Sequence, residues 1–205
     1  MIINRCPNLE ELALCSFSSC TRVFDFSRVT EGRWPKLHSL TLGAFGYQTD
    51  FSLGPAEDPF LGLFLDAHPT LKFMRLQWNF KRWVSPNEIP LHLPPTALPE
   101  LDTFIGIYQQ LAGLPHPDSI EMLDLTCEPL NEDRVSDIAD VLRPLTSLKA
   151  LDLWAHVADP SQNHTHMFYG IVSACPKLTD FHFMCTTSFT SVRVSPVSLP
   201  VFLMS

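Results

Sequence analysis

The chain has 205 residues, 45% of them apolar, and a formal net charge of −8. This length allows one ordinary core or one short repeat array. The acidic balance, with no run of lysine or arginine, argues against a nucleic-acid partner. No apolar stretch reaches the roughly 18 residues that span a bilayer, so we expect no membrane binding. The N-terminal segment MIINRCPNLEE has neither the apolar core nor the cleavage site of a secretory signal, which favours an intracellular protein.

A nine-residue motif recurs seven times along the chain. The copies are Cys6–Leu14 (CPNLEELAL), Trp34–Leu42 (WPKLHSLTL), His68–Leu76 (HPTLKFMRL), Leu98–Gly106 (LPELDTFIG), Pro117–Leu125 (PDSIEMLDL), Leu145–Leu153 (LTSLKALDL) and Cys175–Phe183 (CPKLTDFHF). Each ends in apolar-x-x-apolar-x-apolar, except that Gly106 takes the last apolar position of the fourth copy. Units that recur at this spacing indicate a solenoid, because no single repeat can bury its own apolar face.

The end of each motif has the alternation of a strand with one buried face. In the first copy, Leu12 and Leu14 are expected to point inward, and Glu11, Ala13 and Cys15 outward. The first apolar residues of successive copies are separated by 28, 34, 30, 19, 28 and 30 residues. Their mean of about 28 falls in the range of leucine-rich repeats. We therefore expect the short strands to stack into a parallel sheet on the concave face of an arc.

Three connections between motifs are predicted to be helices, namely Asp58–Asp66, Asn131–Leu142 and Asp159–Ala174. Each begins with a side chain that can cap a helix, and Pro59 and Pro160 fit a first helical turn. The second helix has the clearest inward face, formed by Val135, Ile138, Ala139 and Leu142. The third places Phe168, Ile171 and Val172 inward.

The middle and the end of the chain are predicted to be irregular. Residues 86–99 contain five prolines, which favours an extended loop on the convex side. The 19 residues between Leu101 and Ile120 leave no room for a full helix, so we expect a bend there. Residues 1–188 form the predicted repeat domain, and residues 189–205 an irregular tail or cap. Because solenoids need polar caps, the alternative is that another chain covers the ends.

The copies CPNLEELAL, CPKLTDFHF and LTSLKALDL resemble the leucine-rich repeats of F-box proteins, especially the divergent fungal versions. The resemblance covers roughly Cys6 to Cys185. It implies an α/β leucine-rich-repeat solenoid, with a short-stranded parallel sheet on the concave face and irregular loops and short helices on the convex face. In that family the repeats select a target protein, and a separate N-terminal F-box docks to the ubiquitin-ligase core. Nothing in this chain matches an F-box, so the resemblance implies the target-selecting part, with an F-box segment or another chain covering its ends.

The outward strand positions form the predicted protein-binding surface on the concave face. Its candidate residues are Phe73, Arg75, Gln77, Ile105, Met122, Asp124, Asp152, Trp154, Asp180 and His182. The apolar members, together with Ile107 and Met184, would form the kind of patch that marks an interface.

Asp124 and Asp152 fall at the same offset on adjacent predicted strands, where like charges are unfavourable. One interpretation is a small acidic site, flanked by Trp154 and His182, that receives a basic or amide-rich partner segment. The alternative is that water or a neighbouring hydroxyl such as Thr126 satisfies both carboxylates.

A hydrolase or metal enzyme that uses cysteine or histidine is the alternative from another functional class. The six cysteines include no C-x-x-C pair and no zinc-finger spacing, and we expect reduced thiols. His164 and His166 would point about 200° apart on a helix, which is poor geometry for sharing a metal. No G-x-S-x-G, glycine-rich phosphate loop or H-E-x-x-H occurs. We therefore expect no catalytic residue, no cofactor and no metal.

Overall fold

The computed structural model describes residues 5–16, 31–44, 60–79, 93–131, 134–157, 165–186 and 192–194. These residues form an α/β structure in which short helices separate most of the strands. The chain divides into two compact units, Met1–His116 (unit 1) and Pro117–Ser205 (unit 2). The division falls between Leu101 and Ile120, in the shortest interval between two motifs.

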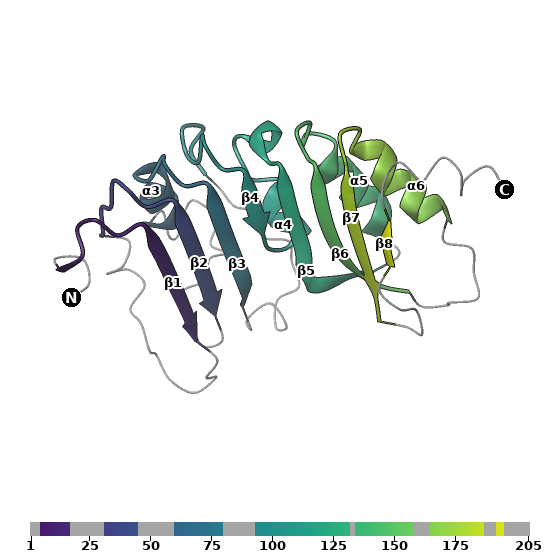
Figure 1. Ribbon diagram of the computed structural model, residues 1–205, viewed down its shortest axis with the longest axis horizontal. Coiled ribbons are helices and arrows are strands. Elements are labelled where there is room, and N and C mark those ends of the chain that lie inside the picture. Colours follow the sequence, from purple (N-terminus) through teal and green to yellow (C-terminus); the bar gives the residue numbers. More distant parts are fainter. Residues whose placement is uncertain are drawn as a thin grey trace. The chain divides into compact units, whose positions relative to one another are not determined.

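Unit 1 contains parallel strands that pair in chain order (Figure 1). They are β1 (Glu11–Ser16), β2 (Ser39–Ala44), β3 (Phe73–Asn79) and β4 (Thr103–Ile105). Helix α3 (Phe60–Asp66) precedes β3, and the single turn α4 (Tyr108–Leu111) follows β4. The described part of the proline-rich segment, residues 93–100, contains turns and no helix.

Unit 2 repeats this arrangement with β5 (Met122–Asn131), β6 (Ala150–His156) and β7 (Asp180–Cys185), which pair in parallel. A 3-10 turn (Pro117–Ser119) precedes β5, α5 (Val135–Leu142) joins β5 to β6, and α6 (Thr165–Ala174) leads into β7. The helices α5 and α6 lie together behind these strands in Figure 1. The segment expected to be an irregular tail contains β8 (Val192–Val194), which pairs antiparallel with β7.

Every copy of the motif begins with the same backbone turn. The amide of the first apolar residue donates a hydrogen bond to the carbonyl three residues before it. The seven bonds run from Leu9 to Cys6, Leu37 to Trp34, Leu71 to His68, Leu101 to Leu98, Ile120 to Pro117, Leu148 to Leu145 and Leu178 to Cys175, over 3.0–3.3 Å. Five copies have proline at the second position of this turn, where its fixed φ favours a β-turn. The recurring proline of the sequence is therefore a turn residue.

A second repeated contact joins successive motifs within each unit. In unit 1 the carbonyl of Glu10 accepts the amides of His38 and Ser39, and the carbonyls of His38 and Lys72 do the same one repeat further on. In unit 2 the carbonyl of Glu121 accepts the amides of Lys149 and Ala150, and the carbonyl of Lys149 accepts those of Thr179 and Asp180. The donor–acceptor distances are 2.8–3.3 Å. Equivalent backbone positions are thus tied together, which keeps successive strands in register.

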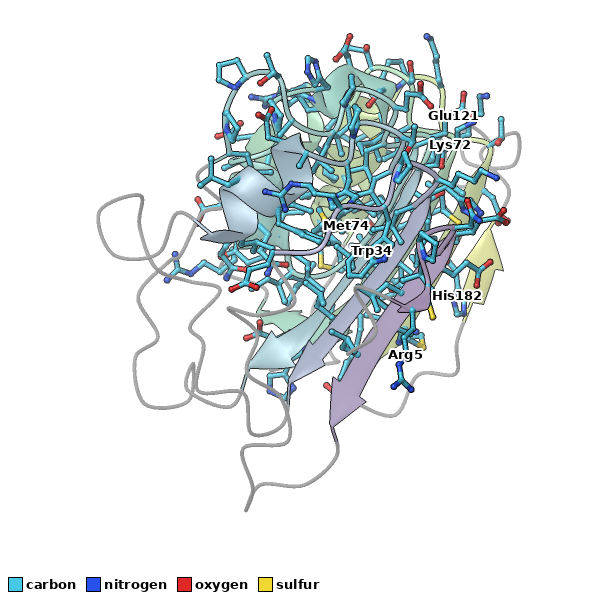
Figure 2. The ribbon with its side chains drawn as sticks, turned by 90° about the vertical axis from the view of Figure 1, so that its left-hand side faces the viewer. Arg5, Trp34, Lys72, Met74, Glu121 and His182 are labelled. Carbon is cyan, nitrogen blue, oxygen red and sulfur yellow. The ribbon has the colours of Figure 1, made fainter. Side chains whose placement is uncertain are left out.

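The inward strand positions fill the core of each unit, as the alternation predicted. In unit 1, Leu12, Leu40, Met74 and Phe104 are paired in register, and each is at most 6% exposed. In unit 2, Leu123, Leu151 and Phe181 form the equivalent row and are at most 1% exposed. Figure 2 shows Met74 on the side of the unit 1 strands where α3 lies. Each large side chain buried in this way stabilises the fold by roughly 1.5–3 kcal/mol.

The predicted start of the helix after β5 is wrong. Asn131 is the last residue of β5 and pairs with His156 of β6, so its backbone belongs to the sheet and does not cap a helix. The helix begins at Val135, and its N-cap, Arg134, makes no side-chain capping hydrogen bond. Its inward face is as predicted at Ile138, Ala139 and Leu142, which are buried. The other two predicted helices appear as α3 and α6, whose expected caps, Asp58 and Asp159, lie outside the described residues.

Gly106 interrupts the motif for a steric reason. A Cβ atom at this position would lie 2.7 Å from the ring of Phe104 and 2.5 Å from Oε1 of Gln110. Phe104 is fully buried, and Gln110 Oε1 accepts the amide of Ile107 at 3.1 Å, so neither neighbour moves freely. We expect Gly106→Ala to lower the free energy of unfolding by about 1–3 kcal/mol, as other overpacking changes do. Urea denaturation followed by circular dichroism measures this loss, and an unchanged midpoint would contradict it.

Candidate protein-binding face

The strand residues that point away from the core form an outer face on each unit. On unit 2 this face, here called the unit 2 face, consists of Met122, Asp124, Ala150, Asp152, Trp154, Asp180, His182 and Met184. All of them are exposed or half-buried. Figure 2 labels His182 among these side chains. Six residues of the predicted binding surface thus lie together on three neighbouring strands. They are Met122, Asp124, Asp152, Trp154, Asp180 and His182.

The centre of the unit 2 face is a row of three titratable side chains. Asp124 pairs in register with Asp152, and Asp152 pairs with His182. The predicted adjacency of the two carboxylates is therefore confirmed. A directly opposed pair of like charges destabilises a sheet unless each charge is compensated.

Asp124 has hydrogen-bond donors inside the protein, and Asp152 lies close to a histidine. Asp124 Oδ1 accepts hydrogen bonds from the amide of Thr126 at 2.8 Å and from its hydroxyl at 2.6 Å. Asp152 Oδ1 lies 3.6 Å from Nδ1 of His182. The alternative in which Thr126 satisfies a carboxylate is thus confirmed for Asp124. The carboxylate of Asp124 is therefore satisfied without a partner protein.

Apolar side chains flank the row on both sides. Met122 is 38% exposed, which makes it one of the large apolar side chains that protrude from the described surface. Trp154 and Met184 pair in register on the other side and are half-buried. Tryptophan and methionine are enriched in protein interfaces. The unit 2 face therefore combines carboxylates with the apolar anchors that an interface uses.

One residue of this region was missed at the sequence level. His156 continues the outward alternation of β6 one step beyond Trp154, is exposed, and has Nδ1 2.8 Å from the hydroxyl of Thr186. The same alternation that identified Asp152 and Trp154 would have found it. Arg193 of β8 lies opposite His182 in the antiparallel pairing, a position that no repeat pattern predicts.

The outer face of unit 1 agrees less well with the prediction. Phe73 and Arg75 lie half-buried on β3 as expected. Ile105 was expected to be exposed, but it is only 9% exposed. Because β4 ends at Ile105 and the chain turns at Gly106 into α4, strand alternation does not continue to Ile107. Gln77 belongs to β3, but its side chain lies outside the described residues.

The cysteine and histidine side chains considered for catalysis can be placed in the described part of the chain. Cys6, Cys127, Cys175 and Cys185 are not in disulfide bonds. Burial raises the pKa of Cys175 to about 11, so this thiol is not a thiolate nucleophile at neutral pH. Among the described residues, no group of three histidine, cysteine or acidic side chains could hold a metal ion. None of the described helices is both long and apolar enough to cross a membrane.

Comparison with protein-family models and with curated proteins finds no match for this chain.

Proposed function

We propose that this chain is a leucine-rich-repeat solenoid that serves as a protein-interaction module. The observation that carries this proposal is the turn that opens all seven motifs, followed by a strand that pairs in parallel with its neighbour in the same unit. Stacked repeats with equivalent backbone contacts bury one side of each strand and leave the other side as a continuous surface. Proteins of this architecture use such a surface for binding.

The unit 2 face is the proposed site of contact with the partner. Trp154 and Met122 supply apolar anchors, while Asp124, Asp152 and Asp180 supply carboxylates. A partner segment with basic or amide side chains next to an apolar residue complements this composition. Binding energy in such interfaces is concentrated in a few aromatic and charged residues. Trp154 is the residue from which we expect the largest contribution.

The narrower form of the proposal is an intracellular adaptor of the F-box type, whose repeats select a target for a ubiquitin ligase. It is supported by the resemblance of CPNLEELAL, CPKLTDFHF and LTSLKALDL to the repeats of that family. The absence of a disulfide at Cys6 and Cys175 agrees with a reducing compartment. The coding region upstream of Met1 tests this form. An F-box encoded there supports it, and a complete transcript without one contradicts it.

Substitutions on the unit 2 face test the general proposal. We expect Trp154→Ala to reduce affinity for a captured partner at least about 30-fold, the effect of losing a 2 kcal/mol hot spot. Asp152→Asn should weaken binding less and make it less sensitive to salt. Affinity purification with quantitative mass spectrometry identifies the partner, and titration of that purified partner measures the loss.

Tyr169→Ala is the matched control, because Tyr169 is a 61% exposed aromatic residue on α6 and not on the sheet. It should leave binding unchanged, and thermal unfolding should show that all three variants remain folded. Equal recovery of every partner by wild type and Trp154→Ala would exclude this face. If Asp152→Ala also increased stability, the acidic row would be ordinary solvated surface.

A further inference from the structure

Trp34, Phe64 and His68 form a buried aromatic cluster in unit 1. Each is at most 2% exposed, and His68 is the buried polar residue among the described side chains. The His68 ring lies 4.3 Å from the ring of Phe64 and 5.9 Å from that of Trp34, measured between centroids. Figure 2 shows Trp34 on the same side of the unit 1 strands as α3. The first position of the motif, which His68 occupies, is otherwise held by Cys6, Trp34, Leu98, Pro117, Leu145 and Cys175.

Backbone groups from two different segments engage both ring nitrogens of His68. The amide of Trp34, in the turn of the preceding motif, donates to Nε2 at 3.0 Å. Nδ1 lies 2.6 Å from the carbonyl of Phe64 in α3. A backbone amide can only donate and a carbonyl can only accept. The neutral ring must therefore carry its proton on Nδ1 and accept at Nε2.

Protonation of this ring would break one of its two bonds. An imidazolium carries hydrogen on both nitrogens. A proton on Nε2 would point at the hydrogen of the Trp34 amide, so that bond would become a repulsive contact. The Trp34 amide would then be a buried donor without an acceptor, which costs about 1–3 kcal/mol.

The surroundings of the ring also disfavour its charge. Burial lowers the pKa of His68 from its usual 6.5, the hydrogen bond to Phe64 opposes part of this effect, and the nearby charge of Arg33 lowers it further. On the turn segment, Glu31 and Lys36 are exposed. On α3, Asp66 accepts the hydroxyl of Thr96 at 2.5 Å. The segment after the ring contributes Lys72, which is exposed and lies 4.0 Å from Glu100.

We propose that His68 is a proton-sensitive tie that joins α3 to the turn of the preceding repeat and releases it on acidification. When the ring is neutral, the two segments are held together through one side chain. When it is protonated, the Trp34 turn and α3 separate locally, while unit 2 is unaffected. The strand β3, which carries the outer positions Phe73 and Arg75, begins five residues after His68.

The direction of the pH dependence follows from the lowered pKa of the folded state. Above the unfolded value of 6.5 the ring is neutral in both states, and the tie contributes its full stability. As the pH falls below 6.5, the unfolded or opened form takes up the proton first. The equilibrium constant for opening then rises by at most about tenfold per pH unit. This rise ends when the folded form is protonated as well.

Hydrogen exchange of the full chain at pH 7.5, 6.5 and 5.5 tests the proposal, with rates corrected for intrinsic exchange. We expect protection of residues 34–37 and of α3 to fall about tenfold between pH 7.5 and pH 5.5, with about fivefold of this loss between pH 6.5 and pH 5.5. Protection of α5 in unit 2 should not change. An equal change in both units, or no change in either, would overturn the proposal.

Two variants separate the tie from a general effect of histidine. His68→Gln keeps a polar side chain without a titrating ring. The hydrogen-exchange protection of α3 should therefore be the same at all three pH values. The His156→Gln variant, changed in unit 2, should keep the pH dependence of α3 protection. If His68→Gln does not fold, nitrogen-15 spectra of the wild-type histidines decide: a ring protonated on Nδ1 alone at pH 6.5 supports the proposal, and a doubly protonated ring there refutes it.

Discussion

Replacing Leu151 with alanine is expected to lower the free energy of unfolding by about 2–5 kcal/mol, the usual cost of a large-to-small change in a core. Leu151 is 1% exposed and lies on β6, between Leu123 of β5 and Phe181 of β7. These three side chains are buried side by side in the core of unit 2. Removing atoms from Leu151 therefore leaves a cavity between Leu123 and Phe181. The loss should exceed that of any change on the outer face.

Urea denaturation monitored by circular dichroism measures this loss. Leu63→Ala is the matched control because it makes the same chemical change at a side chain that is 56% exposed. It should alter stability by no more than about 0.5 kcal/mol. A near-neutral Leu151→Ala variant would mean that the inward face of β6 is assigned to the wrong residues.

Replacing Trp34 with alanine is expected to cost about 3–5 kcal/mol, the largest effect we expect in unit 1. Trp34 is 2% exposed and contacts the ring of Phe64 edge to face, with centroids 6.2 Å apart. The same residue supplies the amide that holds His68. Alanine keeps the amide but removes the indole that packs on α3, so both the hydrophobic contact and the position of the turn are affected.

Trp34→Phe separates the two properties of the indole. Its Nε1 is buried and has no hydrogen-bond partner among the described residues. An unsatisfied buried donor costs about 1–3 kcal/mol. Phenylalanine removes this cost, which offsets part of the packing energy lost with the smaller side chain. We expect Trp34→Phe to lose less than half as much stability as Trp34→Ala in the same denaturation experiment. Equal losses would indicate that the indole N–H has an acceptor in solution.

Short-range pattern was enough to predict the repeated unit. The apolar positions of each motif predict a strand with one buried face, because this alternation depends on a few adjacent residues. Leu12, Leu40, Leu123 and Leu151 are buried as the alternation required. The register that brings Asp124 beside Asp152 followed from the same pattern, since equivalent positions of stacked motifs lie opposite each other.

The errors fall where pairing between strands overrides local preference. Asn131 has the side chain of a good helix cap, yet its pairing with His156 extends β5. The pairing between β5 and β6 changes register between Leu125 and Leu130, a stretch that includes Pro129, and no repeat pattern indicates that the strand resumes beyond it. Ile105 was misjudged because β4 stops at that residue. The first two outcomes depend on a strand remote in the sequence, and the third depends on where β4 ends.

By itself, the amino-acid sequence determined the motif and the choice of inward side chains, because these depend on chemistry repeated within nine residues. Only the tertiary structure decided how individual polar groups are satisfied. Thr126 holds Asp124, His182 lies beside Asp152, and the Trp34 amide and Phe64 carbonyl set the tautomer of His68. Except for Thr126, these partners are 4 to 34 residues away along the chain, and hydrogen bonds need donor and acceptor within about 3 Å. No pattern along one dimension specifies that distance.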